Sequence, residues 1–184
     1  MRYIYIDLGA FNGDTIQRFL DGEMDCDYPV LSKEFEIYGF EPNPKLFILL
    51  SKQYKDNNNI YLSNKLVYTN SDTIDFYIDP SSTSPMGSTA IKSKGTELNG
   101  RVIQAECFDF SEWIKQFKGC YIFVKMDIEG AEFEVLEKMK IDGTDKMINE
   151  LLVETHPNKC REYTTTYSNA LINSLQCGKV NNHR

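Results

Sequence analysis

Carboxylates occur in this sequence where short apolar runs end. Asp7, Glu41 and Asp127 each stand directly after such a run, and Glu154 with His156 follows another. A carboxylate can accept hydrogen bonds from two hydroxyls, balance a cation or take a proton, and imidazole transfers protons near neutral pH. Because ligands of parallel sheets bind beyond the carboxyl ends of the strands, these residues are the first candidates for binding and chemistry.

The first position opens a glycine-containing turn, IDLGAFNGDT, at residues 6–15. Gly9 permits a tight turn and close approach of a ligand, and Gly13 opens a helix whose amides face the same cleft. A dinucleotide fingerprint would have glycine where Phe11 stands, and Asp7 would repel a pyrophosphate. The turn therefore favours a ligand with an ammonium group. An ordinary turn with an aspartate cap is the alternative.

Glu41 lies in GFEPNP, at the end of the second predicted strand. This is the position at which a carboxylate holds the diol of a ribose. Pro42 and Pro44 stiffen the turn and begin a helix, so a glutamate stabilised by the helix dipole is the alternative. Acidic residues at two neighbouring strand ends, Asp7 and Glu41, favour adenosine with a cationic tail.

A charged cluster, KMDIEGAE at residues 125–132, interrupts the most apolar part of the chain. Lys125 and Asp127 are two residues apart and share one face of the strand. A buried lysine is unfavourable unless it is paired, and Asp7 or Asp127 could pair with it. Such a pair is compatible with a structural and with a catalytic role. His156 is a candidate base, with a hydrogen-bonded loop histidine as the alternative.

Strands and helices must position these candidates. Apolar runs predict strands at 2–6, 36–40, 60–68, 73–78, 101–108, 121–126 and 149–154. Helical periodicity predicts helices at 14–20, 44–54, 131–140 and 163–175, and we expect Ser111 to cap a further helix that carries Trp113 and Phe117. This alternation is typical of an α/β protein with a mostly parallel, twisted sheet and helices on both faces.

The composition disfavours several classes of partner and location. The 184 residues carry 20 Lys and Arg against 27 Asp and Glu, a net charge of −7, which disfavours nucleic acid and anionic membranes. No run approaches the ~18 apolar residues of a membrane span. The five cysteines form no C-x-x-C pair, which predicts reduced thiols in a cytoplasmic protein. We expect a single domain over residues 1–184.

Three motifs, IDLGAFNG, GFEPNP and KMDIEGAEFEVL in this order, resemble those of the FkbM family of S-adenosylmethionine-dependent methyltransferases. The resemblance extends from Ile6 to about His156, and the third motif is the most specific. It implies a class I, Rossmann-like fold and methylation of a hydroxyl oxygen, often on a sugar or a polyketide. For this chain it implies carbohydrate modification by an O-methyltransferase with a small-molecule or glycan acceptor.

The resemblance also implies a set of cofactor contacts. The turn at residues 7–13 would line the methionine part, Glu41 would hold the ribose hydroxyls, and Asn64 or Leu66 would lie near the adenine. The expected cofactor-binding residues are Asp7, Gly9, Ala10, Phe11, Asn12, Gly13, Asp14, Thr15, Glu41, Pro42, Asn64, Leu66 and Asp127. Asp109 matches an acidic family position before a helix, where we expect it to act as a cap.

Two departures from the family pattern concern the lengths of segments. Asp7 and Glu41 are 34 residues apart, so residues 21–34 are expected to form an insertion beside the cleft. The closing antiparallel strand pair of class I enzymes is expected to be absent or shortened, in a trimmed chain, a naturally short one or a homodimer that completes the sheet. The Ser/Thr-rich residues 81–90, in the long loop 79–100 near the site, are expected to close over the substrate or to be a disordered loop.

Methyl transfer requires the acceptor oxygen in line with the methyl group and a base for its proton. Asp127 and Glu129 would border the methyl group. We expect His156 or Asp127 to be the base and Lys125 to orient the carboxylates. In a rival mechanism, a divalent cation on Asp127, Glu129 and Glu154 acidifies the hydroxyl, and ligands that are all oxygen would favour Mg²⁺.

Two other classes of function share the predicted fold. A nicotinamide-dependent oxidoreductase would also use Glu41, but the missing middle glycine and the charge of Asp7 disfavour it. A non-catalytic adaptor would bind the cofactor without turnover.

Overall fold

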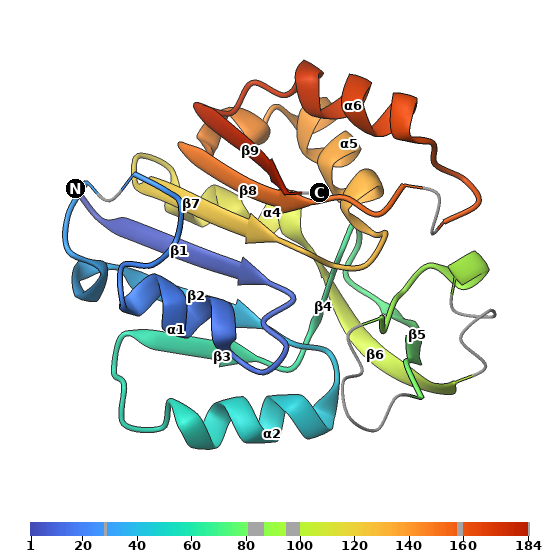
Figure 1. The fold of residues 1–184 in the computed structure, drawn as a ribbon, viewed down its shortest axis with the longest axis horizontal. Helices are drawn as coiled ribbons and strands as arrows, with labels where there is room; N and C mark the ends of the chain where they lie inside the picture. Colours follow the sequence, from blue (N-terminus) through green and yellow to red (C-terminus); the bar gives the residue numbers. More distant parts are fainter. Residues whose placement is uncertain (28, 81–86, 95–99, 158–159, 184) are drawn as a thin grey trace.

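The computed structural model describes residues 1–27, 29–80, 87–94, 100–157 and 160–183. Six parallel strands form the main sheet in the order β3-β2-β1-β7-β8-β9 (Figure 1). β1 and β7 are central and buried, as their unbroken apolar sequences predict. The strands of this sheet are β1 (Tyr3–Leu8), β2 (Glu36–Phe40), β3 (Ile60–Ser63), β7 (Tyr121–Met126), β8 (Glu150–Glu154) and β9 (Lys179–His183).

Helices cover both faces of this sheet, because successive residues of β1 alternate between two apolar clusters. Ile4 and Ile6 pack in one cluster with α4, α5 and α6, and Tyr5 packs in the other with α1 and α2. The helices are α1 (Asp14–Leu20), α2 (Pro44–Gln53), α4 (Phe110–Trp113), α5 (Glu132–Asp142) and α6 (Thr165–Ser174), with short 3₁₀ turns η1 (Ser32–Glu34), η2 (Ile114–Phe117) and η3 (Asp145–Met147).

A second sheet of three strands lies beyond the carboxyl ends of the main strands (Figure 1). Its order is β4-β6-β5, with β4 (Leu66–Tyr68) parallel and β5 (Thr73–Ile78) antiparallel to β6 (Arg101–Asp109). The prediction of one strand over 60–68 is therefore wrong. Asn64 separates β3 from β4, since its side-chain amide donates to the carbonyl oxygens of Glu41 (2.8 Å) and Pro42 (3.1 Å).

Several element boundaries differ from the prediction for local reasons. β1 continues to Leu8, two residues beyond the predicted end, so Asp7 lies inside the strand. Asp109 caps α4 by accepting from the amide of Glu112, as predicted for Asp109, whereas Ser111 lies within the helix and is not its cap. The last helix begins after Thr164, whose side chain caps it, rather than at residue 163.

The C-terminal residues add a strand that the sequence did not predict. β9 lies parallel to β8, with Lys179 opposite Glu150. The Lys179 ammonium lies 3.2 Å from the buried carboxylate of Glu150 and 3.3 Å from the exposed carboxylate of Asp27, and both contacts are compatible with this register. Among the described residues, one parallel strand, β9, thus stands at the edge of the sheet where the closing antiparallel strand pair was expected to be absent or shortened. No helix in the described ranges is long and apolar enough to cross a bilayer.

Gly9 connects the sheet to the site, because its φ of +87° is left-handed and a Cβ there would lie 2.0 Å from the Asp127 carbonyl oxygen. Gly119 has a similar φ of +84°, with no atom within 4 Å of a Cβ. Gly119→Ala should destabilise the fold by roughly 1–2 kcal/mol, the cost of the left-handed conformation. Gly9→Ala should cost more than about 3 kcal/mol, because backbone atoms must also move. Urea unfolding of the two variants measures this, and equal destabilisation would contradict the close approach.

Candidate functional site

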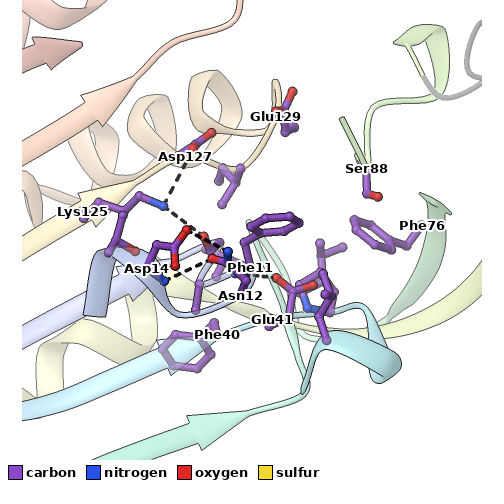
Figure 2. A pocket seen from close by; sticks show the side chains of 18 residues that line it. Phe11, Asn12, Asp14, Phe40, Glu41, Phe76, Ser88, Lys125, Asp127 and Glu129 are labelled. Carbon is purple, nitrogen blue, oxygen red and sulfur yellow. Dashed lines mark hydrogen bonds and ion pairs between the residues drawn. The ribbon is translucent and has the colours of Figure 1, made fainter. Parts of the chain in front are cut away.

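A cavity of about 410 Å³ opens where β1, β2 and β7 end, between the main sheet and the second sheet (Figure 2). This volume lies within the range of small-molecule and cofactor pockets. Its wall contains twelve of the predicted site residues: Gly9, Ala10, Phe11, Asn12, Asp14, Thr15, Glu41, Pro42, Leu66, Lys125, Asp127 and Glu129. The remaining wall residues are Phe40, Leu46, Val67, Phe76, Ser88 and Ile128.

The loop after β1 is bound to the end of β2. The amides of Gly9 and Ala10 donate to the carbonyl oxygen of Phe40 at 3.2 and 2.9 Å. Phe11 then adopts a left-handed φ of 49°, which is uncommon for a residue with a side chain. This conformation directs its amide to Glu41. The loop therefore presents a fixed backbone to the cavity.

Glu41 is held in one orientation at the cavity wall. Its two carboxylate oxygens accept from the amides of Phe11 (2.9 Å) and Asn43 (2.7 Å), and Asn64 binds its carbonyl oxygen from behind. Burial raises the pKa of Glu41 to about 7, although the two amide donors oppose the rise. Asn64 itself lies outside the cavity wall, so it positions this turn, while Leu66 lines the cavity.

The buried ammonium group of Lys125 connects the ends of β1 and β7. It donates to the carbonyl oxygen of Gly9 at 2.9 Å and lies 3.3 Å from the carboxylate of Asp7. It also lies 3.8 Å from the carboxylate of Asp127 (Figure 2). Burial alone would lower the pKa of Lys125, but the two carboxylates outweigh it and raise the pKa. Lys125 is therefore a permanent cation in the cavity wall.

Asp7 lies behind the cavity wall. The side chain is fully buried and lies opposite Lys125 in the β1–β7 register, and it accepts a hydrogen bond from the Thr15 hydroxyl. Asp7 is not among the residues that line the cavity, because the strand continues past it and turns the side chain toward α1. The cation that Asp7 meets in this structure is the protein's own Lys125, and its contact with a cofactor stays a prediction. Gly13 also lies outside the wall.

His156 lies behind the wall, within a group of carboxylates. Its Nε2 lies 3.5 Å from Glu129, 3.7 Å from Glu154 and 3.8 Å from Asp127, and its Nδ1 lies 3.0 Å from Glu132. Burial alone would lower the pKa of His156, but Glu132 and the other carboxylates outweigh it and raise the pKa. His156 is not among the residues that line the cavity, whereas Asp127 is, so Asp127 is the better placed base.

Glu129 lies where the loop after β7 meets the segment 87–94. Its φ of 57° is left-handed, its carbonyl oxygen accepts from the Thr89 hydroxyl at 2.7 Å, and its carboxylate pairs with the nearly buried Lys94. Ser88, in the same segment, lines the cavity. This is the described part of the loop for which a role over the substrate was predicted; residues 81–86 and 95–99 lie outside the described residues.

A smaller pocket of about 210 Å³ adjoins the main cavity through three shared wall residues, Thr15, Lys125 and Asp127. Residues 23–25 of the predicted insertion line it together with Arg18 and Glu154. The insertion is therefore part of a pocket wall, as its predicted place beside the cleft implies.

Sequence reasoning missed several residues of the site. Glu132 and Lys94 act through contacts with residues far along the chain, and Phe76 enters the wall from the second sheet. The motif KMDIEGAE contains Glu132, so its place in this charged cluster was the available signal. Nothing in the sequence near Lys94 or Phe76 distinguishes them.

Comparisons with known proteins agree with this architecture. A family model described as Methyltransferase FkbM domain matches residues 7–180. The crystal structure of Methyltransferase FkbM from Methylobacillus flagellatus KT superposes with a TM-score of 0.55 and 16% sequence identity, over 94% of this chain and 38% of that one. A search of curated proteins finds no match. The present chain thus corresponds to less than half the length of that structure, and the predicted Rossmann-like α/β fold is confirmed.

The raised pKa of Glu41 predicts a pH dependence of stability. Between the unfolded value near 4.5 and the folded value of about 7, the folded protein binds the extra proton, so stability falls as pH rises through this window. Glu41→Gln should remove that slope, so the variant should gain about 2 kcal/mol relative to wild type between pH 5 and pH 7. Urea unfolding at several pH values measures the difference. Asp56→Asn, at a side chain that is 86% exposed, is the control, and identical slopes for wild type and Glu41→Gln would contradict the burial effect.

Proposed function

The chain belongs to the FkbM methyltransferase domain family, and we propose that it transfers a methyl group from S-adenosylmethionine to a hydroxyl oxygen of a sugar or glycan. The observation that carries this proposal is the fixed carboxylate of Glu41 in the wall of a cofactor-sized cavity. Each carboxylate oxygen uses one lone pair on a backbone amide, which leaves further acceptor capacity for ribose hydroxyls.

The cavity offers complementary surroundings for the other parts of this cofactor. Apolar side chains beside Glu41 provide a surface for an adenine ring: Phe40, Leu66, Val67 and Phe76. Elsewhere in the wall, Asp127 supplies a carboxylate that suits an ammonium group. Lys125 is the cation nearest to Asp127, where it suits a carboxylate group. In this proposal the methionine part lies between those groups.

Methyl transfer to oxygen requires alignment of the acceptor and removal of one proton. The S–CH₃ bond breaks while the O–CH₃ bond forms, and the sulfonium becomes a neutral thioether. Asp127 is the proposed base, because it borders both the main cavity and the smaller pocket. Lys125 holds its carboxylate in place, and Glu129 contributes charge to the same wall.

The smaller pocket is the proposed acceptor site. It meets the main cavity at Asp127, and its wall carries Arg18, Glu23, Asp25 and Glu154. Charged and hydrogen-bonding groups at this density suit a polyhydroxylated acceptor better than an apolar one. The apolar side chains of Met24, Met126 and Leu152 complete the wall, and the charged groups support the choice of a sugar over a polyketide.

The proposal includes the remaining expectations from the sequence. We propose a cytoplasmic location with reduced thiols, because the five cysteines form no C-x-x-C pair. A homodimer, and the absence of nucleic-acid and membrane partners, stay predictions. The nicotinamide-dependent alternative is weakened by the family assignment. The adaptor alternative differs only in lacking turnover.

The first test is calorimetric binding of S-adenosylhomocysteine and of NAD⁺. Wild type should bind S-adenosylhomocysteine at least about 100-fold more tightly than NAD⁺. Glu41→Gln should weaken that binding at least about 10-fold, because charge-assisted hydrogen bonds to the ribose contribute about 1.5–3 kcal/mol. Asp56→Asn should bind as wild type does. Unchanged affinity in Glu41→Gln would contradict the proposed role, and binding without methylation of any hydroxylated acceptor would favour the adaptor.

The second test concerns the acceptor. Sugars and glycans are screened for a mass increase of one methylene, and the best acceptor is taken into kinetics. Glu23→Gln combined with Asp25→Asn changes only the smaller pocket and its rim. This double variant should raise the acceptor KM about 10-fold with little change in kcat, while the affinity for S-adenosylhomocysteine stays the same. An unchanged KM would move the acceptor to another surface.

A further inference from the structure

We propose that Asp127, Glu129 and His156 bind one divalent transition-metal ion, such as Mn²⁺, at the wall of the main cavity. Ligand atoms of these three residues lie within 4.8 Å of one another. The inference goes beyond methyl transfer, which requires no metal. It also changes the ligand set expected from the sequence, with the imidazole of His156 in place of the carboxylate of Glu154.

The spacing of the ligand atoms fits a metal ion. His156 Nε2 lies 3.5 Å from Glu129 Oε2 and 3.8 Å from Asp127 Oδ1. Adjacent ligands at about 2.1 Å from an octahedral ion are about 3.0 Å apart, and opposite ligands about 4.2 Å. A movement of about 0.5–0.8 Å of the imidazole nitrogen relative to the two carboxylate oxygens would therefore bring these atoms to coordination distance.

The imidazole is held as a metal ligand would be. The His156 side chain is 2% exposed, and no hydrogen bond reaches its Nε2 within the part of the chain that the structure describes. An ionised carboxylate only accepts hydrogen bonds, so Glu132 at 3.0 Å places the proton of a neutral ring on Nδ1. The lone pair of Nε2 then faces Asp127 and Glu129. Ligating histidines are commonly oriented by a carboxylate in this way.

Glu132 is itself fixed, so the orientation of the ring does not depend on solvent. The Glu132 side chain is fully buried, and its two oxygens accept from the amides of Gly130 and His156, each at 2.7 Å. Glu132 is the first residue of α5, two residues after Gly130, so the motif KMDIEGAE contains both the ligands Asp127 and Glu129 and the residue that orients His156.

A second, independent observation points to a missing cation. Asp127 Oδ1 is buried and has no hydrogen-bond partner among the described residues. Buried polar atoms nearly always have a partner, and an ion is one of the usual reasons for an exception. The orphaned oxygen is the one that faces His156 Nε2.

The charges around the site allow a divalent ion. Four carboxylates surround the imidazole ring: Asp127, Glu129, Glu132 and Glu154. Lys94 pairs with Glu129 and lies on the side of the segment 87–94, so its ammonium must move from that carboxylate when an ion binds. One imidazole nitrogen with carboxylate oxygens favours Mn²⁺, Fe²⁺ or Zn²⁺ over Mg²⁺. An acceptor hydroxyl coordinated there would lose its proton more readily.

The test measures binding of Mn²⁺ to chelator-treated full-length protein, by calorimetry and by loss of the free Mn²⁺ electron paramagnetic resonance signal. Wild type should bind one equivalent, more tightly than Mg²⁺. Asp127→Asn and His156→Gln should each weaken binding at least about 10-fold, and Glu132→Gln about 10-fold, through the orientation of the ring. Lys94→Gln should tighten it, because the competing ammonium is removed. Glu154→Gln should stay within about threefold, and Asp56→Asn should match wild type.

Binding of S-adenosylhomocysteine to each variant is measured in parallel without metal, so failure of the metal site and failure of the proposed function are distinguishable. Variants that retain this binding are folded. Absence of saturable Mn²⁺ binding to the wild type would overturn the proposal. Mn²⁺ binding that His156→Gln leaves unchanged, or tighter binding of Mg²⁺, would overturn it as well.

Discussion

The site depends on one buried charge, the ammonium group of Lys125. It contacts Asp7 in the neighbouring strand, the carbonyl oxygen of Gly9 in the loop after that strand, and Asp127 at the end of its own strand. Desolvation of an ammonium group is expensive, and loss of one partner from a buried pair costs about 3–5 kcal/mol. The alignment of β1 with β7 and the path of the first loop are therefore coupled to this cation. The wall residues from Gly9 to Thr15 and from Asp127 to Glu129 follow those two strand ends.

Much of the fold followed from apolar patterning. The central strand β7, the cap at Asp109 and the helix that begins at Pro44 agree with the sequence prediction. The prediction of one strand over residues 60–68 was wrong, because an apolar run does not reveal that Asn64 binds the backbone of a distant turn and divides the strand. The last strand, β9, has few apolar residues, and its pairing depends on contacts of Lys179 with residues far along the chain. The local periodicity of apolar residues does not predict contacts between residues that are far apart in the sequence.

The candidate site, like the fold, was predicted only in part from the sequence. Because parallel strands end at the same edge of a sheet, the positions of Glu41, Lys125 and Asp127 at strand ends predicted that they lie close together, and all three line one cavity. The sequence did not reveal that Asp7 is fully buried within β1, because the predicted strand ended two residues before the observed one. The environment of His156 could not be foreseen, as Glu132 meets it only through folding. The sequence shows only that residue 156 is a histidine. An exposed imidazole and an imidazole surrounded by four carboxylates have different chemistry.

The most direct measurement is a crystal structure of this chain with S-adenosylhomocysteine. The account predicts the ribose hydroxyls within about 3 Å of the Glu41 carboxylate, with the sulfur atom near Asp127 and the Lys125 contacts to Asp7 and Gly9 retained. A nucleoside bound elsewhere, or a ribose turned away from Glu41 in this cavity, would contradict it.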